Sequence, residues 1–239
     1  MTKKTTWDST LTEMFAGGAI PQAIHRVLLW GPPRTGKSSV AYTIVGEDRV
    51  ERVTLHRQQP VDDLVGGYCL KDGSTVWADG PAVRAMRDGK VLVLDEIDQY
   101  SPETRCVLHA LMDEPSGVTL ASGERVAAVY GYVVIATTNA LPGTLPPAIL
   151  DRFDLILKAD TLAAGLQKRL GAMAAPAGNT IGREANRYDW TRQTSVNLFI
   201  SAAKLRTFGM NDEQIGAVLG LTGTDLVDFL TAIAPPVSA

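Results

Sequence analysis

The octapeptide GPPRTGKS, residues 31–38, is the most informative segment of this chain. A short apolar run over residues 27–30 precedes it, and a helical pattern over residues 38–45 follows it. The spacing fits G-x-x-x-x-G-K-[ST], and the motif requires a strand before the loop and a helix after it. Glycines let such a backbone wrap an anion, so that successive N–H groups converge on phosphate oxygens. We therefore predict a loop that holds the phosphates of ATP.

The side chains of this loop have separate expected tasks. Lys37 places a point charge on the β- and γ-phosphates, and Ser38 offers its hydroxyl to Mg²⁺. The residues predicted to contact the nucleotide here are Gly31, Pro32, Pro33, Arg34, Thr35, Gly36, Lys37, Ser38 and Ser39.

A second motif, VLVLDEID over residues 91–98, is an apolar run that ends in carboxylates. We expect Asp95 to hold Mg²⁺, mostly through water. Glu96 is expected to orient or deprotonate the attacking water, and Asp98 to have a structural, supporting role. The alternative is a strand that simply ends in a solvated acidic turn.

Two further polar positions follow later apolar segments. Asn139 ends the run YVVIATTN and is expected to position the attacking water or touch the γ-phosphate; the alternative is a turn-forming asparagine. Arg152 lies in LDRFD and is expected to stabilise transition-state charge as an arginine finger. Its alternative is a surface salt bridge with Asp151 or Asp154.

Strand-like and helix-like segments alternate up to about residue 159, which predicts a parallel α/β sheet covered by helices on both faces. From there the pattern is helical only, with helices expected near 161–173, 194–208, 212–219 and 224–233. We therefore expect a nucleotide-binding core over residues 1–159 and a small all-helical lid over residues 160–239.

Several elements of the core have specific signals. Asp72-Gly73 predicts a hairpin turn within 68–77, and Ser122-Gly123-Glu124 predicts another within 118–130. A helix is expected over 102–112, with Ser101 as its cap and Pro102 in its first turn. The remaining predictions are strands over 50–55, 91–94, 132–136 and 153–157 and helices over 80–89 and 146–150.

The composition excludes several classes of protein. Hydrophobic residues make up 45% of the 239 residues, enough for a packed core, and the formal net charge of −3 argues against a strongly basic nucleic-acid binder. The two cysteines, Cys69 and Cys106, are too few for a disulfide framework or a zinc cluster. Apolar runs fall short of a membrane span, and the first residues lack the apolar stretch of a signal peptide. We expect a cytoplasmic protein of bacterial or phage origin, with no membrane partner.

The order of the four motifs resembles that of the AAA+ P-loop ATPases, most closely the MoxR-like branch, over about residues 20–235. The resemblance implies ATP hydrolysis that drives the remodelling or assembly of a protein partner, often together with a von Willebrand factor A-domain protein. It implies that Arg152 acts on the ATP bound to the neighbouring subunit. The chain would then form a homo-oligomeric ring, which we expect to be a hexamer.

The same resemblance points to more residues. Hairpins at these places face a central pore or substrate in related rings, which makes Tyr68, Trp77 and Arg125 candidate substrate contacts; packing within the hairpins is the alternative. The segment 195–205 resembles a lid helix whose arginine senses the γ-phosphate, but Asn197 stands at that position, unless Arg192 replaces it. Arg34 stands where glycine is common, which the pattern tolerates.

Two other functions remain open from the sequence. One is a motor that acts on nucleic acid, because related hairpin-bearing rings do so. The other is a nucleotide-gated scaffold subunit with little turnover, suggested by Asn197.

Overall fold

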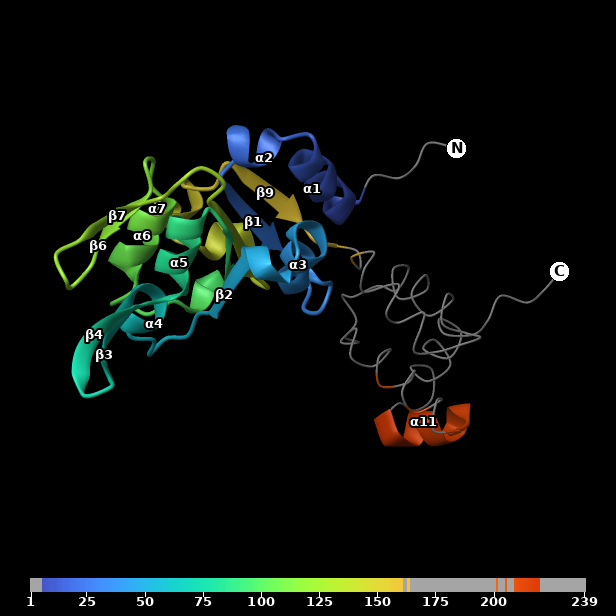
Figure 1. Cartoon of the computed structure of the whole chain (residues 1–239). Helices are drawn as coiled ribbons and strands as arrows, with labels where there is room; N and C mark the ends of the chain where they lie inside the picture. Colours follow the sequence, from blue (N-terminus) through green and yellow to red (C-terminus); the bar gives the residue numbers. More distant parts are fainter. Residues whose placement is uncertain (1–5, 161–162, 164–200, 202–204, 206–208, 220–239) are drawn as a thin grey trace. The chain divides into compact units, whose positions relative to one another are not determined.

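The computed structural model describes residues 6–160, 163, 201, 205 and 209–219 (Figure 1). The chain divides into two compact units, of which the first comprises residues 1–31 and 37–158 and the second residues 32–36 and 159–239. The proposed assignment of residues 1–159 to a core and 160–239 to a lid stays a prediction.

A five-stranded sheet forms the centre of the first unit, in the order β2-β5-β8-β1-β9. Its strands are β1 (Arg26–Trp30), β2 (Val50–Thr54), β5 (Val91–Asp95), β8 (Val133–Thr138) and β9 (Leu155–Lys158). Each neighbouring pair is parallel. Every residue of β5 and β8 is buried, as expected for inner strands covered on both faces. The predicted parallel α/β sheet is therefore confirmed.

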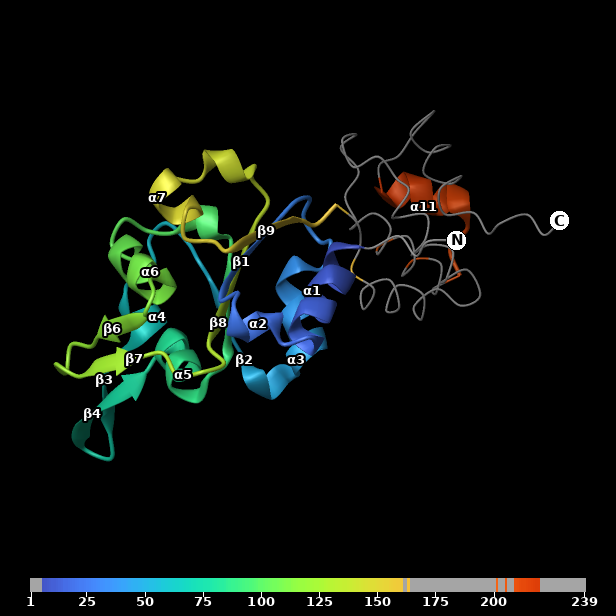
Figure 2. The same cartoon turned by 90° about the horizontal axis from the view of Figure 1, so that it is seen from above.

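Helices cover both faces of this sheet. Figure 2 shows α1, α2 and α3 on one side and α5 and α6 on the other. The helices of the unit are α1 (Trp7–Ala16), α2 (Ala19–Gln22), α3 (Val40–Val45), α4 (Asp62–Val65), α5 (Pro81–Asp88), α6 (Arg105–Met112) and α7 (Pro147–Leu150). Short 3₁₀ turns are η1 (Lys37–Ser39), η2 (Glu47–Arg49), η3 (Ile97–Gln99) and η4 (Pro142–Thr144).

Two antiparallel hairpins stand apart from the main sheet. They are β3 (Gly66–Lys71) with β4 (Ser74–Asp79), and β6 (Gly117–Thr119) with β7 (Arg125–Ala127). Asp72 and Gly73 have φ values of 51° and 77°, the left-handed pair that a two-residue turn of this kind needs. Both predicted hairpins are confirmed.

The start of α6 differs from the sequence prediction. The helix begins at Arg105, three residues after the expected first position, Pro102. The hydroxyl of Ser101 accepts a hydrogen bond from the N–H of Thr104 at 3.1 Å, and the hydroxyl of Thr104 donates to the carbonyl of Ser101 at 3.0 Å. These short-range bonds close a separate turn before the helix. Ser101 therefore does not cap a helix that starts at Pro102, and that prediction is wrong. The last strand likewise begins at Leu155 instead of Phe153.

In the second unit, α11 (Asp212–Leu219) confirms the helix predicted over 212–219. Asn211 and Gln214 cap it reciprocally, each side chain accepting from the other's backbone N–H at 2.9 and 3.0 Å. The other predicted lid helices lie almost entirely outside the described residues. Within the residues that the structure describes, no helix has the length and hydrophobicity to cross a membrane.

Candidate nucleotide site

Polar side chains gather where the parallel strands of the first unit end. β1 leads into the loop at Gly31, β5 ends at Asp95, and β8 ends at Thr138 next to Asn139. The strands are in register, with Trp30 opposite Thr138 and Thr54 opposite Asp95. Ligands of open parallel sheets bind outside the carboxyl ends of the strands, so this edge is the expected place for a nucleotide.

Lys37 connects two of the predicted motifs. Its residue is only 6% exposed, and its Nζ donates to the carbonyl of Gly31 at 2.9 Å and to Oδ1 of Asn139 at 3.0 Å. Burial lowers the pKa of Lys37 to about 8, whereas the charge of Asp95 acts in the opposite direction. The structure thus brings together Lys37 and Asn139, which lie 102 positions apart in the sequence.

The loop backbone visits conformations that suit glycine. Gly31 and Gly36 have φ values of 144° and 99°, and Arg34, which is exposed, has φ of 63°. A side chain in this left-handed region costs about 1–3 kcal/mol, which accounts for the preference for glycine at the position of Arg34. Thr35 is buried and donates to the carbonyl of Pro32 at 3.2 Å. Pro33 and Ser39 are exposed, whereas Ser38 is half-buried in η1.

Asp95 is a buried carboxylate with both oxygens occupied by side chains. It is 2% exposed, and its Oδ1 accepts from the hydroxyl of Thr137 at 2.8 Å. Its Oδ2 accepts from Nε of Arg52 at 2.5 Å and forms an ion pair with Nη2 of the same guanidinium, also at 2.5 Å. A buried charge needs such compensation, because water no longer solvates it.

Glu96 follows in a left-handed conformation, with φ of 56°. Its backbone N–H donates to the hydroxyl of Thr137 at 3.3 Å, so that one threonine supports both acids. The next threonine, Thr138, donates to Oδ1 of Asp98 at 2.6 Å, which agrees with a structural role for Asp98. The side chain of Glu96 is exposed and available to a ligand.

Arg152 lies away from these residues. Its Nε donates to Oδ1 of Asp113 at 2.8 Å, and its Nη1 donates to the carbonyl of Ala148. Its ion-pair partner is therefore Asp113, which follows α6, and not Asp151 or Asp154. Asp154 instead pairs with Arg26.

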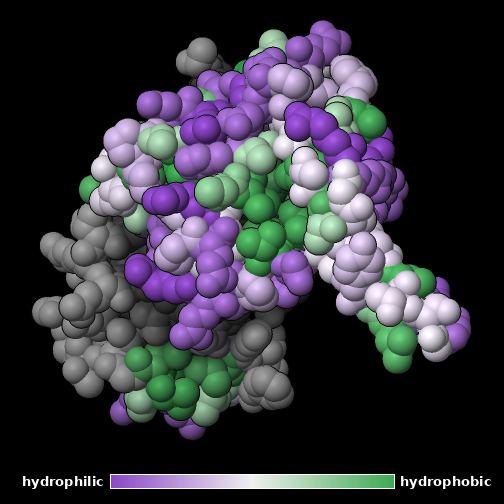
Figure 3. All heavy atoms as spheres, turned by 90° about the vertical axis from the view of Figure 1, so that its left-hand side faces the viewer, coloured by the Kyte–Doolittle hydropathy of each residue, from purple (hydrophilic) through white to green (hydrophobic). Residues whose placement is uncertain are grey.

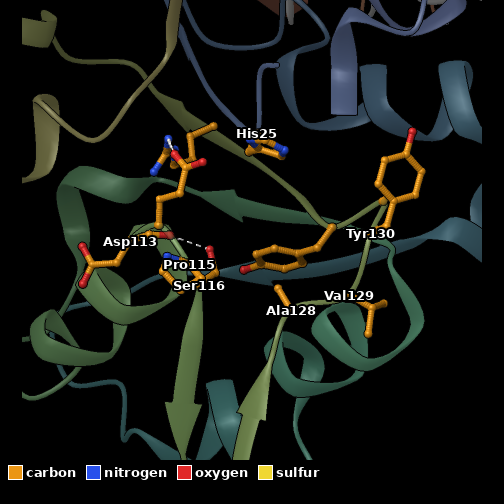
Figure 4. A pocket seen from close by; sticks show the side chains of 11 residues that line it. His25, Asp113, Pro115, Ser116, Ala128, Val129 and Tyr130 are labelled. Carbon is orange, nitrogen blue, oxygen red and sulfur yellow. Dashed lines mark hydrogen bonds and ion pairs between the residues drawn. The ribbon is translucent and has the colours of Figure 1, made fainter. Parts of the chain in front are cut away.

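A cavity of about 230 Å³ lies at the other ends of the strands (Figure 4). Figure 4 shows Asp113, Pro115 and Ser116 on one side of it and His25 and Tyr130 across from them. Because His25 directly precedes β1 and Tyr130 lies shortly before β8, this cavity is at the amino ends of these strands, separate from the edge that carries Lys37 and Asp95.

Sequence reasoning missed three residues that support the site. Thr137 and Thr138 stand directly before Asn139, so their place at a strand end was a usable signal. The sequence around Arg52 contains no such signal, because the contact of Arg52 with Asp95 depends on the pairing of β2 with β5. Asn197 and Arg192 lie outside the described residues.

Comparison with known proteins agrees with this geometry. Residues 26–153 match the AAA domain family of the dynein-related subfamily. Protein NorQ of Paracoccus denitrificans (strain Pd 1222) is 32% identical over 214 residues, which cover 81% of this chain and 78% of NorQ. An uncharacterized protein of Staphylococcus aureus (strain USA300) is 34% identical over 141 residues, about half of each chain at 54%. The chain therefore belongs to the dynein-related AAA domains and, among the AAA+ ATPases, to the MoxR-like branch.

Proposed function

We propose that this protein assembles into a homo-oligomeric ring of six subunits and hydrolyses Mg²⁺-bound ATP there. The ring uses the free energy of this reaction to remodel or assemble a protein partner. One observation carries the proposal: the buried ammonium of Lys37 is hydrogen-bonded to Asn139 at the strand edge where Asp95 also lies. The buried cation of Lys37 suits the phosphates, and the buried carboxylate of Asp95 and the hydroxyl of Ser38 suit the metal ion. Together these three groups fit a metal-bound triphosphate.

The first task of these residues is binding. Lys37 would move from the carbonyl of Gly31 to the β- and γ-phosphates, whose charge compensates its burial. Ser38 and Asp95 would hold Mg²⁺, with Thr137 fixing the rotamer of Asp95. When bound, Mg²⁺-ATP supplies the phosphoanhydride bond that is cleaved and the charge that the metal neutralises.

The second task is the activation of water. Glu96 would take a proton from the attacking water, because its carboxylate is exposed next to the buried Asp95. Asn139 would orient the same water through its amide. The support of Asp95 and of the Glu96 backbone by Thr137 keeps the metal ligand and the base in a fixed relation.

Arg152 would act on the ATP of the neighbouring subunit. Its contacts with Asp113 and Ala148 place it apart from Lys37 and Asn139, which supports a role in trans. There it would stabilise the charge that develops on the transferred phosphoryl group.

The hairpins support a protein partner over nucleic acid. The β3–β4 hairpin stands out from the surface and carries Leu70 and Tyr68, which are 77% and 58% exposed (Figure 3). Each hairpin turn has one cation and one anion, Lys71 with Asp72 and Arg125 with Glu124. Such balanced turns lack the basic surface that phosphate backbones require. By family resemblance, the partner includes a von Willebrand factor A-domain protein.

The candidate substrate contacts differ in their surroundings. Trp77 is half-buried against the core, and its Nε1 donates to Asp79 at 2.7 Å. Its ring meets that of Tyr68 edge-on at 5.3 Å. Trp77 thus has a packing role, and we propose the exposed Tyr68, Leu70 and Arg125 as the substrate contacts.

The test is the ATPase rate as a function of protein concentration, with mass measured alongside, for the wild type, Glu96→Gln and Arg152→Ala. We expect activity per subunit to rise with assembly and to vanish in both variants. ATP binding without turnover at any concentration would contradict the proposal and leave a nucleotide-gated scaffold.

A further inference from the structure

Arg26, the first residue of β1, has an unusually complete set of partners. Its side chain is 12% exposed, and its guanidinium donates to Asp154 through Nε at 3.1 Å and through Nη2 at 2.7 Å. The backbone N–H groups of His25 and Arg26 donate to the same carboxylate at 2.9 and 3.0 Å. Asp154 lies two residues after Arg152, so the segment that carries Arg152 is tied to β1.

The same guanidinium reaches a second segment. Its Nη1 donates to the carbonyl of Met112 at 2.8 Å, and its Nη2 contacts Oε2 of Glu114 at 3.0 Å. The residue between these two is Asp113, which binds Arg152. Arg26 therefore joins the segment that carries Arg152 to the segment that carries its acceptor.

We propose that Arg26 is a positioning residue for Arg152: it fixes residues 112–114 against residue 154, and so presents Arg152 to the ATP of the neighbouring subunit. The inference rests on the proposed action of Arg152 in trans. A planar guanidinium suits the task, because it can bind a carboxylate with two donors and still reach a carbonyl.

The charges of this cluster stay in place at neutral pH. Burial alone would raise the pKa of Asp154, but the bonds from Arg26 and from the backbone of His25 lower it overall. The same carboxylate raises the pKa of Arg26. The connection between the two segments is thus an ion pair throughout the range in which the ATPase would be assayed.

A positioning role predicts a defect on one side of each subunit only. A subunit with Arg26→Gln would bind and hydrolyse its own ATP normally when a neighbour with a well-placed Arg152 completes the site. The same subunit would place its own Arg152 poorly in the site of the next subunit. Mixed rings separate these two abilities, since the interface between subunits of a ring joins two different surfaces.

The test uses equimolar mixtures of full-length variants. Alone, Arg26→Gln should lower kcat at least tenfold, with nucleotide affinity within twofold of the wild type. Mixed with Glu96→Gln, it should regain about a quarter of wild-type activity, because about one interface in four then combines an intact Glu96 with a well-placed Arg152. Mixed with Arg152→Ala, it should regain none.

Arg87→Gln is the matched control. Arg87 also joins two segments, with Nε on Asp79 at 2.8 Å and Nη1 on Glu124 at 2.8 Å, but it does not contact the residues around Arg152. Arg87→Gln should keep kcat within about twofold of the wild type, because the substitution removes only exposed ion pairs, which contribute little to stability. If Arg26→Gln fails to fold, Arg26→Lys is the second variant, because it keeps the positive charge but lacks the planar guanidinium with its several N–H donors. We expect the same loss of activity at the interfaces to which this subunit contributes Arg152.

Two results would overturn the inference. One is a wild-type kcat for Arg26→Gln; the other is no recovery with Glu96→Gln, while Arg152→Ala with Glu96→Gln does recover. If the latter reference pair itself does not recover, Arg152 does not act in trans, and the proposed function fails with the inference.

Discussion

The ammonium of Lys37 lies between two oxygen acceptors, the carbonyl of Gly31 after β1 and the amide of Asn139 after β8. These acceptors hold it in a buried position where desolvation lowers its pKa to about 8. The charge that would bind phosphate is therefore partly lost within the ordinary range of assay pH.

This predicts that nucleotide affinity falls on the alkaline side. With a pKa of about 8, the charged fraction of Lys37 drops from about three quarters at pH 7.5 to about a tenth at pH 9, so the Kd for ADP should rise about eightfold. Isothermal titration calorimetry between pH 7.5 and pH 9 measures this change in Kd. Lys37→Met should bind ADP weakly at every pH and show no such slope; an equal slope in both proteins would contradict the assignment.

Arg52 and a metal ion would compete for the same oxygen of Asp95. We expect Arg52→Gln to raise the apparent Mg²⁺ affinity of the nucleotide complex about fivefold, equivalent to about 1 kcal/mol for a partly exposed ion pair. Titration of Mg²⁺ against a fluorescent ADP measures the change. Arg84→Gln is the control, because Arg84 is as exposed as Arg52, at 45% against 44%, and pairs with Glu51 on the same strand. Equal Mg²⁺ midpoints in the two variants would refute the competition.

Among the helices and strands, the predictable ones are those with a local signal. The apolar runs gave β1, β5 and β8, and Asp72-Gly73 gave the β3–β4 turn, because burial and left-handed φ act on neighbouring residues. The start of α6 was misplaced because the hydroxyls of Ser101 and Thr104 bond to nearby backbone. Ser101 also donates to the carbonyl of Gln59 at 2.8 Å, a contact that no local pattern reveals.

The base of the β3–β4 hairpin depends on two glycines in close backbone contact. A Cβ on Gly80 would lie 2.5 Å from the nitrogen of Gly66 and 2.5 Å from the carbonyl oxygen of Leu64. Gly80→Ala should therefore lower the free energy of unfolding by about 1–3 kcal/mol. Gly143→Ala, whose Cβ meets nothing within 4 Å, should change it by less than about 0.5 kcal/mol. Urea unfolding compares the two; similar midpoints would show that the backbone at Gly80 yields without cost.

For the protein as a whole, the sequence predicted which motifs meet at the candidate site but not how their residues are held. Lys37, Asp95 and Asn139 were predictable because each carries its own chemistry at the end of an apolar run. The contacts of Arg52 with Asp95 and of Arg26 with Asp154 were not, since they depend on strand order and span 43 and 128 positions of sequence. Sites that lie outside the described residues, such as Asn197, stay predictions.

Binding at this site should stabilise the fold that carries it. At 100 times its Kd, Mg²⁺-ADP should add about 2.7 kcal/mol to the free energy of unfolding, because only the folded chain binds it. Differential scanning fluorimetry should show a higher Tm for the wild type and for Glu96→Gln, and no shift for Lys37→Ala. A shift that persists in Lys37→Ala would place the nucleotide elsewhere.

The strand order also governs when the sheet can form during synthesis. Among the strands that the structure describes, β1 comes earliest in the chain, yet its neighbours are β8 and β9, the two that come latest. Val27, Leu28 and Leu29 are fully buried in the finished fold, but their register partners in β8 lie 108 positions later in the chain, and those in β9 lie 128 positions later. At about 5–20 residues per second, the partners in β8 are synthesised roughly 5 to 22 s after β1, and those in β9 roughly 6 to 26 s after it. During this interval the nascent chain carries an apolar strand whose partners have not yet been made, and exposed hydrophobic surface of this kind is prone to aggregate.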